Sequence, residues 1–389
     1  MSLSRYSSPV LRQSVILHPV QTVRLYSWLL YATDGEPSHF PCPHSGTVYI
    51  YISTVGQVEL AKTWAIRCYL PSLILILDGH NISSSEAQEL LGLLQGPSRS
   101  PRQIDVIGLG YIARHAIMEF MLQRNHPALE ELVLRDCGNA LPSLPTASTS
   151  LRRIYIHTAP ETWRHSLPPS QLTVLWLTSM IHANALVAFL VNCPNLESLY
   201  VHIAESGLRP NPESQALKDA TLPQLTYFGL ENDYLVGGEP SRDLLQGFSF
   251  PSLRVAEYSV RRQSQASSLW PGFARILKLV GRLTLQFRVS FPSQDSFFYL
   301  LKHAPSLTEL TISTNARFMS DTITSLASTD VMLPSLQTLY LDGSCKLTKW
   351  LSFQPQLAEF ALAYPSSKPS LTRLVIQYRY SDPVNTEDL

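Results

Sequence analysis

Hydrophobic residues recur along the chain in the spacing apolar-x-x-apolar-x-apolar. The clearest copies have the form P-x-L-x-x-L-x-L, and they lie at 126–139, 193–203, 304–314, 333–343 and 368–378. A relaxed form of the pattern yields 14 units, which start between Val20 and Leu371 and are spaced by about 27 residues on average. A fixed period of this length is typical of a repeat array rather than of separate compact domains.

Each unit predicts a short strand followed by a helix. Alternate side chains of the strand enter a core, and the first apolar residue reaches in from the preceding turn. The intervening segments predict helices over 85–95, 113–123, 184–192 and 295–303, and most of them open with a polar residue suited to helix capping. In seven units a proline two residues before the first leucine ends the helix and extends the entry to the strand.

The alternation of strand and helix at this period resembles the longer, helix-bearing leucine-rich repeats, and the resemblance covers about residues 20–378. In two units the turn position of the family holds Cys137 or Asn315. The resemblance implies an α/β solenoid, a curved stack of about 14 strand-helix units with one parallel sheet on the concave face. Polar stretches at 138–150, 205–221, 231–247 and 259–268 are interpreted as excursions from the solenoid.

A narrower resemblance links residues 46–79 to the segment after the F-box in fungal F-box/leucine-rich-repeat proteins. Trp64 and Arg67 match a W-x-x-R motif of that segment, and Pro71 leads the next strand. The F-box itself is not visible, because residues 1–19 are too few for three helices. We therefore divide the chain into an N-terminal segment (1–19), the solenoid (20–378) and a C-terminal tail (379–389). SCF subunits are expected partners only if an F-box lies upstream.

Composition narrows the class of protein. Hydrophobic residues make up 45% and charged residues 15%, with 30 basic and 30 acidic side chains, so neither disorder nor a nucleic-acid footprint is expected. The longest apolar runs fall far short of the ~20 residues that cross a bilayer, so no membrane partner is expected. Five cysteines without a CxxC pair favour an intracellular location, cytoplasmic or nuclear.

Motifs for catalysis and cofactors are weak. Gly108-x-Gly110-x-x-Ala113, with Asp136 further on, has the form of a dinucleotide fingerprint, but the same unit fits the leucine-rich period. His39, Cys42 and His44 lack the further ligands that a stable metal site needs. We therefore predict no enzyme activity, no cofactor and no metal, and keep a dinucleotide-dependent enzyme as a remote alternative.

The remaining candidate is a surface. Strands stacked in register place the outward residue between the second and third apolar positions in one column, and three consecutive units put Tyr, Trp and Tyr there. Exposed aromatic residues beside arginine carry binding energy at protein interfaces. We predict a protein partner on the concave face, bound through Arg153, Tyr155, His157, Trp176, Tyr200, His202 and Tyr227. The predicted function is a non-enzymatic interaction module, either a substrate receptor of an SCF-type ubiquitin ligase or a free-standing scaffold. Rings that scatter on the surface or lie under a loop are the alternative interpretation.

Overall fold

The structure is a computed structural model of the whole chain, and the residues that it describes all fall within the unit spanning residues 37–389. The described ranges are 47–52, 72–78, 85, 102–107, 129–135, 150–157, 167–181, 183–205, 220–234, 248–260, 270–287, 294–315, 319, 322–324, 326, 333–345, 355–356, 358–362 and 370–380. The first predicted unit, at Val20, lies outside them.

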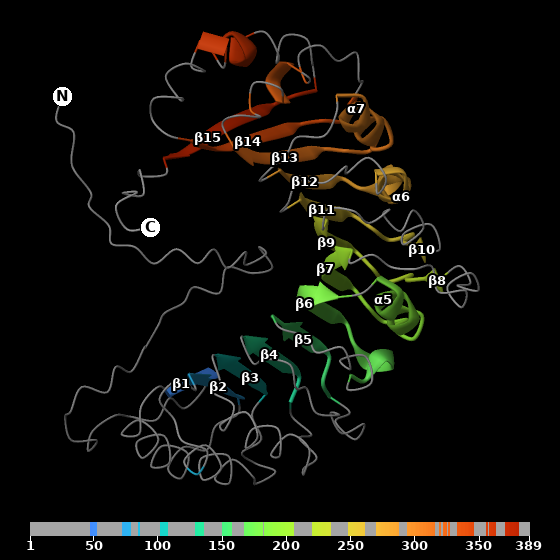
Figure 1. Cartoon of the computed structure of the whole chain (residues 1–389), viewed down its shortest axis with the longest axis vertical. Helices are drawn as coiled ribbons and strands as arrows, with labels where there is room; N and C mark the ends of the chain where they lie inside the picture. The colour runs from blue at the N-terminus through green and yellow to red at the C-terminus, as the bar shows by residue number, and fades with distance from the viewer. Residues whose placement is uncertain are drawn as a thin grey trace, which may run out of the picture. The chain divides into compact units, whose positions relative to one another are not determined.

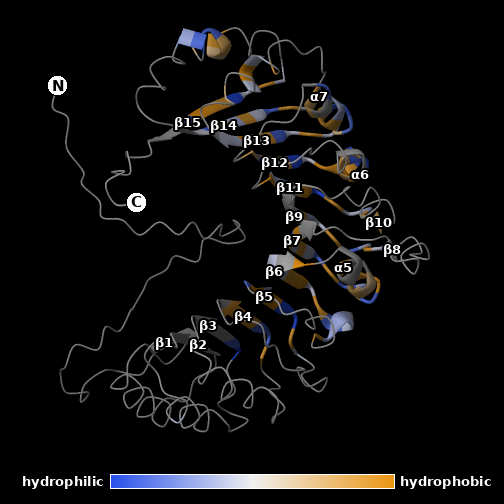
Figure 2. Ribbon diagram, viewed as in Figure 1, coloured by the Kyte–Doolittle hydropathy of each residue, from blue (hydrophilic) through white to orange (hydrophobic). Residues whose placement is uncertain are grey.

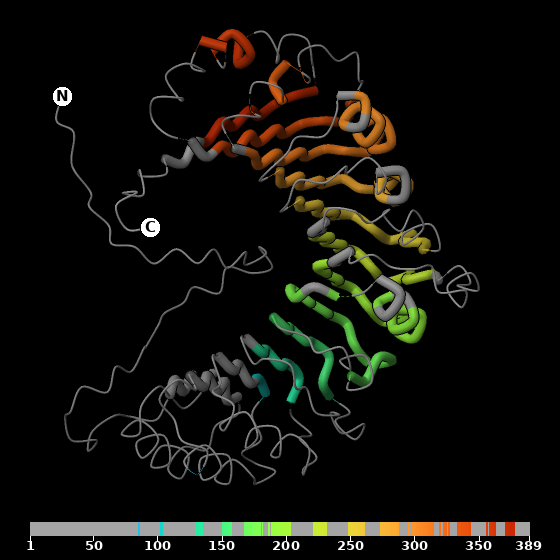
Figure 3. The backbone as a smooth tube through the Cα atoms, viewed as in Figure 1, coloured from blue at the N-terminus to red at the C-terminus, as the bar shows by residue number. Residues whose placement is uncertain are grey.

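A single parallel sheet organises the described residues. Thirteen strands follow one another in chain order, apart from two short strands that pair separately (Figure 1, Figure 3). The strands are β1 (Thr47–Ile52), β2 (Ser72–Asp78), β3 (Gln103–Ile107), β4 (Glu131–Arg135), β5 (Arg153–Ile156), β6 (Val174–Ile181), β7 (Ser198–Glu205), β9 (Tyr227–Tyr234), β11 (Val255–Val260), β12 (Arg282–Phe287), β13 (Glu309–Asn315), β14 (Thr338–Cys345) and β15 (Arg373–Tyr380). One strand therefore stands for each predicted unit from Thr47 onward.

The pairing register agrees with the predicted repeat at most units and corrects it at one. Ile104 pairs with Leu132 on one side and Leu75 on the other, so it occupies the second apolar position of its unit. The spacing apolar-x-x-apolar-x-apolar instead predicts Ile104, Ile107 and Leu109 as the three apolar positions of this unit, which is three residues out of register. The pairing with the neighbouring strands decides between the two alignments.

The three apolar positions of the repeat form a continuous core. In the unit of β7, Leu196, Leu199 and Val201 are all fully buried, as the pattern requires. Equivalent residues of β4 to β14 join them in one hydrophobic cluster (Figure 2). The cluster also takes in residues of the helices α5 (Ala183–Leu190), α6 (Trp270–Ile276) and α7 (Gln294–Lys302), which lie along one side of the sheet (Figure 1).

The residue after the first leucine of each unit makes a ladder of backbone hydrogen bonds. The carbonyl of Thr173, for example, accepts the N–H groups of both Glu197 and Ser198 in the next unit, at 2.8 and 3.0 Å. Polar side chains reinforce the stacking, because Thr226 donates to Glu197 O and Ser306, next to a unit proline, donates to Lys278 O. Neighbouring units are thus tied together at the point where each strand begins.

Two predicted helices are confirmed in substance, since α5 and α7 each begin and end within two residues of the expected bounds. Helix 113–123 lies outside the described residues, and of 85–95 only Ser85 is described, as helical. Shorter helical pieces are η2 (Pro169–Gln171) and η5 (Leu277–Leu279). Helical residues also occur at 319, 322–324, 326, 355–356 and 358–362.

Three of the predicted excursions begin later than expected. Strand β9 continues to Tyr234 and β11 to Val260, so the first residues of the stretches 231–247 and 259–268 are strand. The stretch 205–221 likewise starts on the last residue of β7 and ends on β8 (Ala220–Thr221). Strand β8 pairs in parallel with β10 (Phe248–Ser249), a second small sheet that the sequence pattern did not indicate. Polar residues are tolerated in these strand ends because the backbone pairing continues beyond the apolar triplet.

Candidate partner-binding surface

The predicted column of outward residues exists along the sheet. Backbone pairing joins Val133, Tyr155, Trp176, Tyr200, Gly229, Glu257, Thr284, Thr311, Tyr340 and Val375 in one continuous row. These residues alternate with the core residues of their strands, so they lie on the sheet face opposite the hydrophobic core, here called the ladder face.

Four aromatic rings on the ladder face form one group, in which Trp176 contacts the other three, and we call them the aromatic ladder. Trp176 stands at its centre, with ring centroids 5.7 Å from Tyr155, 5.3 Å from Tyr200 and 5.9 Å from Tyr227. The two contacts toward β7 and β9 are stacked, while the contact with Tyr155 is tilted. The indole N–H donates to Ser198 Oγ at 3.3 Å, which fixes the ring over β7.

Gly229 makes room for this arrangement. A Cβ atom at that position would overlap Cδ2 of Tyr200 and would approach Cε2 of Tyr200 and Oη of Tyr227 to 3.0 Å each. The Tyr200 ring therefore leans across β9 above the glycine, where its hydroxyl meets Glu231 Oε2 at 3.3 Å. The Tyr200 ring can therefore occupy this position only because Gly229 has no side chain.

The ladder is less exposed than the sequence column suggested. Tyr155 and Trp176 are partly exposed, whereas Tyr200 and Tyr227 retain only 9% and 7% of their accessible surface. Arg153 and His157, which flank Tyr155 on β5 and just beyond it, are both exposed. The exposed part of the predicted site is therefore concentrated on β5 and β6, and the part on β7 and β9 is buried.

Two acidic residues that the sequence reasoning did not assign to the site tie the ladder to the next strands. Tyr227 donates to Glu257 Oε2 at 2.9 Å, and Gln286 Nε2 donates to the other oxygen of that carboxylate at 2.8 Å. Glu231 and Glu257 are 2% and 5% exposed. Glu257 pairs with Gly229 in the outward column, so the repeat pattern could have placed this carboxylate beside the tyrosines. Glu231 lies two residues after Gly229 on the same face.

Burial and these carboxylates also change the acidity of the phenols. Burial, reinforced by the negative charge of Glu131, raises the pKa of Tyr155 to about 12. Burial and the adjacent Glu257 raise the pKa of Tyr227 strongly as well. Both phenols therefore stay neutral at physiological pH and act as hydrogen-bond donors.

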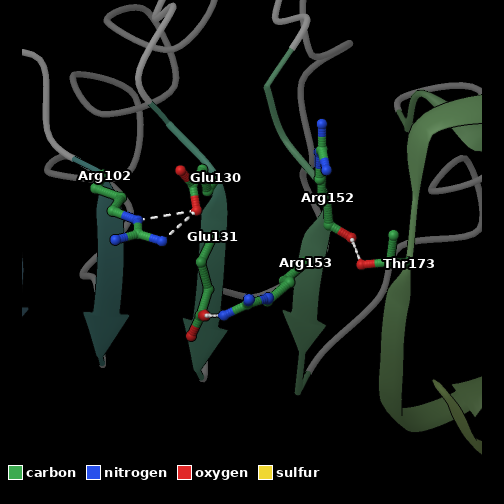
Figure 4. A network of polar contacts seen from close by, with 6 residues as sticks. All are labelled: Arg102, Glu130, Glu131, Arg152, Arg153 and Thr173. Atoms are coloured by element: carbon green, nitrogen blue, oxygen red, sulfur yellow. Dashed lines mark hydrogen bonds and ion pairs between the residues drawn. The ribbon is translucent and has the colours of Figure 1, made fainter. Parts of the chain in front are cut away.

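His202 is drawn inward by an irregularity in β6. The pairing of β6 with β7 shifts between Leu177 and Met180, so that His202 pairs with Met180. The ring Nδ1 lies 3.0 Å from Thr178 O, inside the irregular stretch, and the side chain is 3% exposed. Arg153, another residue of the predicted site, forms an ion pair with Glu131 on β4 at 3.4 Å (Figure 4).

Other candidate chemistry is limited. Cys193 is a free, fully buried thiol, and burial raises its pKa to about 12. Within the described residues no cluster of three or more His, Cys, Asp or Glu side chains is arranged to hold a metal. In the same part of the chain, no helix has the length and hydrophobicity to cross a bilayer. Three candidate motifs lie outside the described residues: the possible metal ligands His39, Cys42 and His44, the glycine motif Gly108–Ala113, and the W-x-x-R pair Trp64 and Arg67.

The strand-helix repeat and the parallel sheet in chain order are the features of a repeat solenoid, and the repeat pattern resembles leucine-rich repeats. No protein-family model matches the chain, and no curated protein matches it. Among solved structures, it is similar to the leucine-rich repeat-containing protein LegL7 from Legionella pneumophila. That similarity has a TM-score of 0.38 and 15% sequence identity, over 86% of this chain and 91% of the other.

Proposed function

We propose that the chain is a non-enzymatic protein-interaction module that binds a protein partner on its ladder face. The observation that carries the proposal is the aromatic ladder itself, in which Tyr155, Trp176 and Tyr200 occupy consecutive paired positions on a sheet face opposite the core. Each of these strands pairs with two neighbours, so the surface is rigid, and a partner would lose little of its binding energy to ordering it.

The contact would centre on the exposed end of the ladder. Tyr155 and Trp176 offer ring edges, because their neighbours already cover part of their faces, and Arg153 and His157 add polar contacts beside them. Tyr200 and Tyr227 would act mainly by holding Trp176 in place, and the buried His202 would support β6 through its contact with Thr178 O. Large, preorganised aromatic side chains of this kind commonly supply the strongest contacts in protein interfaces.

A substrate-receptor role in an SCF-type ubiquitin ligase is a narrower form of this proposal. It is supported by the sequence resemblance of residues 46–79 to the segment that follows an F-box in fungal proteins. A free-standing scaffold is the alternative. Co-purification of SCF subunits with the full chain favours the receptor, and their absence alongside a reproducible partner favours the scaffold.

The test is quantitative affinity purification of the full chain and three variants. Trp176→Ala is expected to lower the affinity for the captured partner by at least about 30-fold, which is the loss typical of a hot-spot residue. Trp176→Phe keeps a ring that can stack on Tyr200, so it distinguishes a loss of binding from a loss of folding. Tyr299→Ala is the control, because it removes an exposed ring on α7. Equal recovery of the same partner by wild type and Trp176→Ala would contradict the proposal.

A further inference from the structure

A polar cavity of about 370 Å³ lies where strands β4 to β7 begin. Its walls come from consecutive units and are lined by Glu130, Ser150, Arg152, Arg153, Thr173 and Glu197. The cavity therefore opens at the entry edge of the same strands that carry Tyr155 and Trp176. Its size is at the small end of the range for ligand sites, sufficient for a few side chains rather than a folded element.

The backbone at the edge of the cavity is fully used by the fold. Arg152 O accepts the N–H of Thr173 at 2.8 Å and the Thr173 hydroxyl at 3.4 Å, and Thr173 O accepts the N–H of Glu197 at 2.8 Å (Figure 4). These bonds set Arg152, Thr173 and Glu197 side by side on three adjacent units. Any ligand in the cavity would consequently be recognised by side chains.

Two of the four charged side chains in the cavity are already neutralised. Glu130 forms an ion pair with Arg102, with contacts of 2.9 and 2.8 Å to Nε and Nη2. Arg153 is paired with Glu131 at 3.4 Å. Both pairs connect neighbouring strands along the edge and stabilise their stacking (Figure 4).

Arg152 and Glu197 are the other two, and both are exposed. Neither side chain has an ion-pair or hydrogen-bond partner among the residues that the structure describes. In Figure 4 the Arg152 guanidinium extends away from Glu130 and Thr173. The cavity thus presents one cation and one anion, separated by the neutral Thr173.

We propose that this cavity is a charge-reading subsite for an extended peptide segment that carries an acidic and a basic side chain two residues apart. Arg152 and Glu197 are two strands apart, about 10 Å at the backbone. Side chains two residues apart on an extended peptide point the same way and are separated by about 7 Å, and the long arginine side chain spans the difference. The acidic side chain meets Arg152, and the basic side chain meets Glu197.

The inference rests on the proposed function, because it names the chemistry of the partner. Arg153 connects the two regions, since it lines the cavity and lies two residues before Tyr155 on β5. A peptide that crosses the starts of β5 to β7 at the cavity would turn along β5 to reach the exposed rings. Rim charges of this type contribute modestly to affinity but select among partners and orient them.

The experiment selects a displayed library of random twelve-residue peptides on the immobilised full chain. Wild type is expected to enrich peptides with an acid and a base two positions apart. Arg152→Glu is expected to enrich two basic residues at that spacing, and Glu197→Arg two acidic ones. Arg254→Glu is the matched control, because Arg254 is exposed at the equivalent position before β11 but does not line the cavity.

Affinities of one wild-type-selected acid–base peptide are then measured against every variant. Each reversal in the cavity should weaken binding about fivefold to tenfold, and added salt should reduce the difference. The control should bind like wild type. A selected consensus without charge, an unchanged consensus for Arg152→Glu and Glu197→Arg, or no enrichment at all overturns the inference.

A further arm with Trp176→Ala separates this inference from the proposed function. If Trp176→Ala abolishes selection while the charge reversals leave the consensus intact, the ladder binds peptides and the cavity does not read charge. If neither kind of variant changes the selected peptides, both the subsite and the ladder-face proposal fail.

Discussion

Replacing Gly229 with alanine should disrupt the aromatic ladder from beneath. The new methyl group would overlap Cδ2 of Tyr200 and lie 3.0 Å from Cε2 of the same ring and from Tyr227 Oη. Tyr200 is 9% exposed, so its ring has little free space into which to move. Relief of the overlap must pull the ring off Trp176 and its hydroxyl away from Glu231.

The expected loss follows from those two contacts. A stacked aromatic pair contributes about 0.5–1.5 kcal/mol, and a hydrogen bond to a charged group about 1.5–3 kcal/mol. Complete loss of both would cost about 2–4.5 kcal/mol, so partial loss should destabilise the chain by about 1–3 kcal/mol, within the usual cost of overpacking a core. The measurement is the urea midpoint of the full chain, followed by tryptophan fluorescence.

Gly281→Ala is the matched control for backbone effects. A methyl group there meets Thr308 Oγ1 at 3.6 Å and Arg254 O at 4.0 Å, which are ordinary contacts. Its stability should stay within about 1 kcal/mol of wild type. In a Tyr200→Ala background, Gly229→Ala should cost much less, because the overlapping ring is gone and only the 3.0 Å contact with Tyr227 Oη remains. Equal stability of the two glycine variants, or an undiminished loss in the Tyr200→Ala background, would refute the described ring geometry.

Three further outcomes are expected. Leu199→Asp places a charge at a fully buried position, so the free energy of unfolding should fall by several kcal/mol and adjacent units should unfold together. Hydrogen exchange that changes only within β7 would contradict a continuous core. The raised pKa of Tyr155, about 12 against an ordinary 10.0, means that the unfolded chain loses this proton first. Its contribution to stability is therefore complete below pH 10 and declines as pH rises from 10 to 12, and the urea midpoint of Tyr155→Phe should fall less steeply over that interval. Cys193 is fully buried and its pKa is raised to about 12, so its thiol should resist alkylation by iodoacetamide in the native chain and react in urea. Mass spectrometry measures the labelling, and rapid labelling of the native chain would show that α5 opens easily.

The sequence pattern was sufficient to predict the column on the ladder face, because the apolar triplet decides which residues of a strand point inward. Trp176 and Tyr200 each lie between two buried apolar residues of their strands, and the pairing places them side by side as expected. The same parity argument predicted the three buried positions of the β7 unit. The parity argument did not predict the extra strands β8 and β10, because each has only two residues.

Burial within the ladder was not predictable from that pattern. It depends on Tyr200 leaning over Gly229 and on tyrosine hydroxyls reaching carboxylates one strand away, contacts between residues about 30 positions apart. The shift in β6 that buries His202 has no marker in its sequence, because no proline or glycine stands at 177–180. The misregister at Ile104 arises because Pro101 stands at the first position of the observed alignment, so the apolar spacing alone favours the alignment that starts at Ile104.

The most direct test of the central claim is site-specific photo-crosslinking in cells of the chain's own source. A photoreactive phenylalanine analogue replaces Tyr155 on the ladder face in one version of the full chain and Tyr299 on α7 in another, both at accessible positions. The account predicts a discrete crosslinked partner from position 155 that is lost when Trp176 is changed to alanine, and none from position 299. The same partner crosslinked from position 299 and not from position 155 would place the working surface on the helical side and contradict the account.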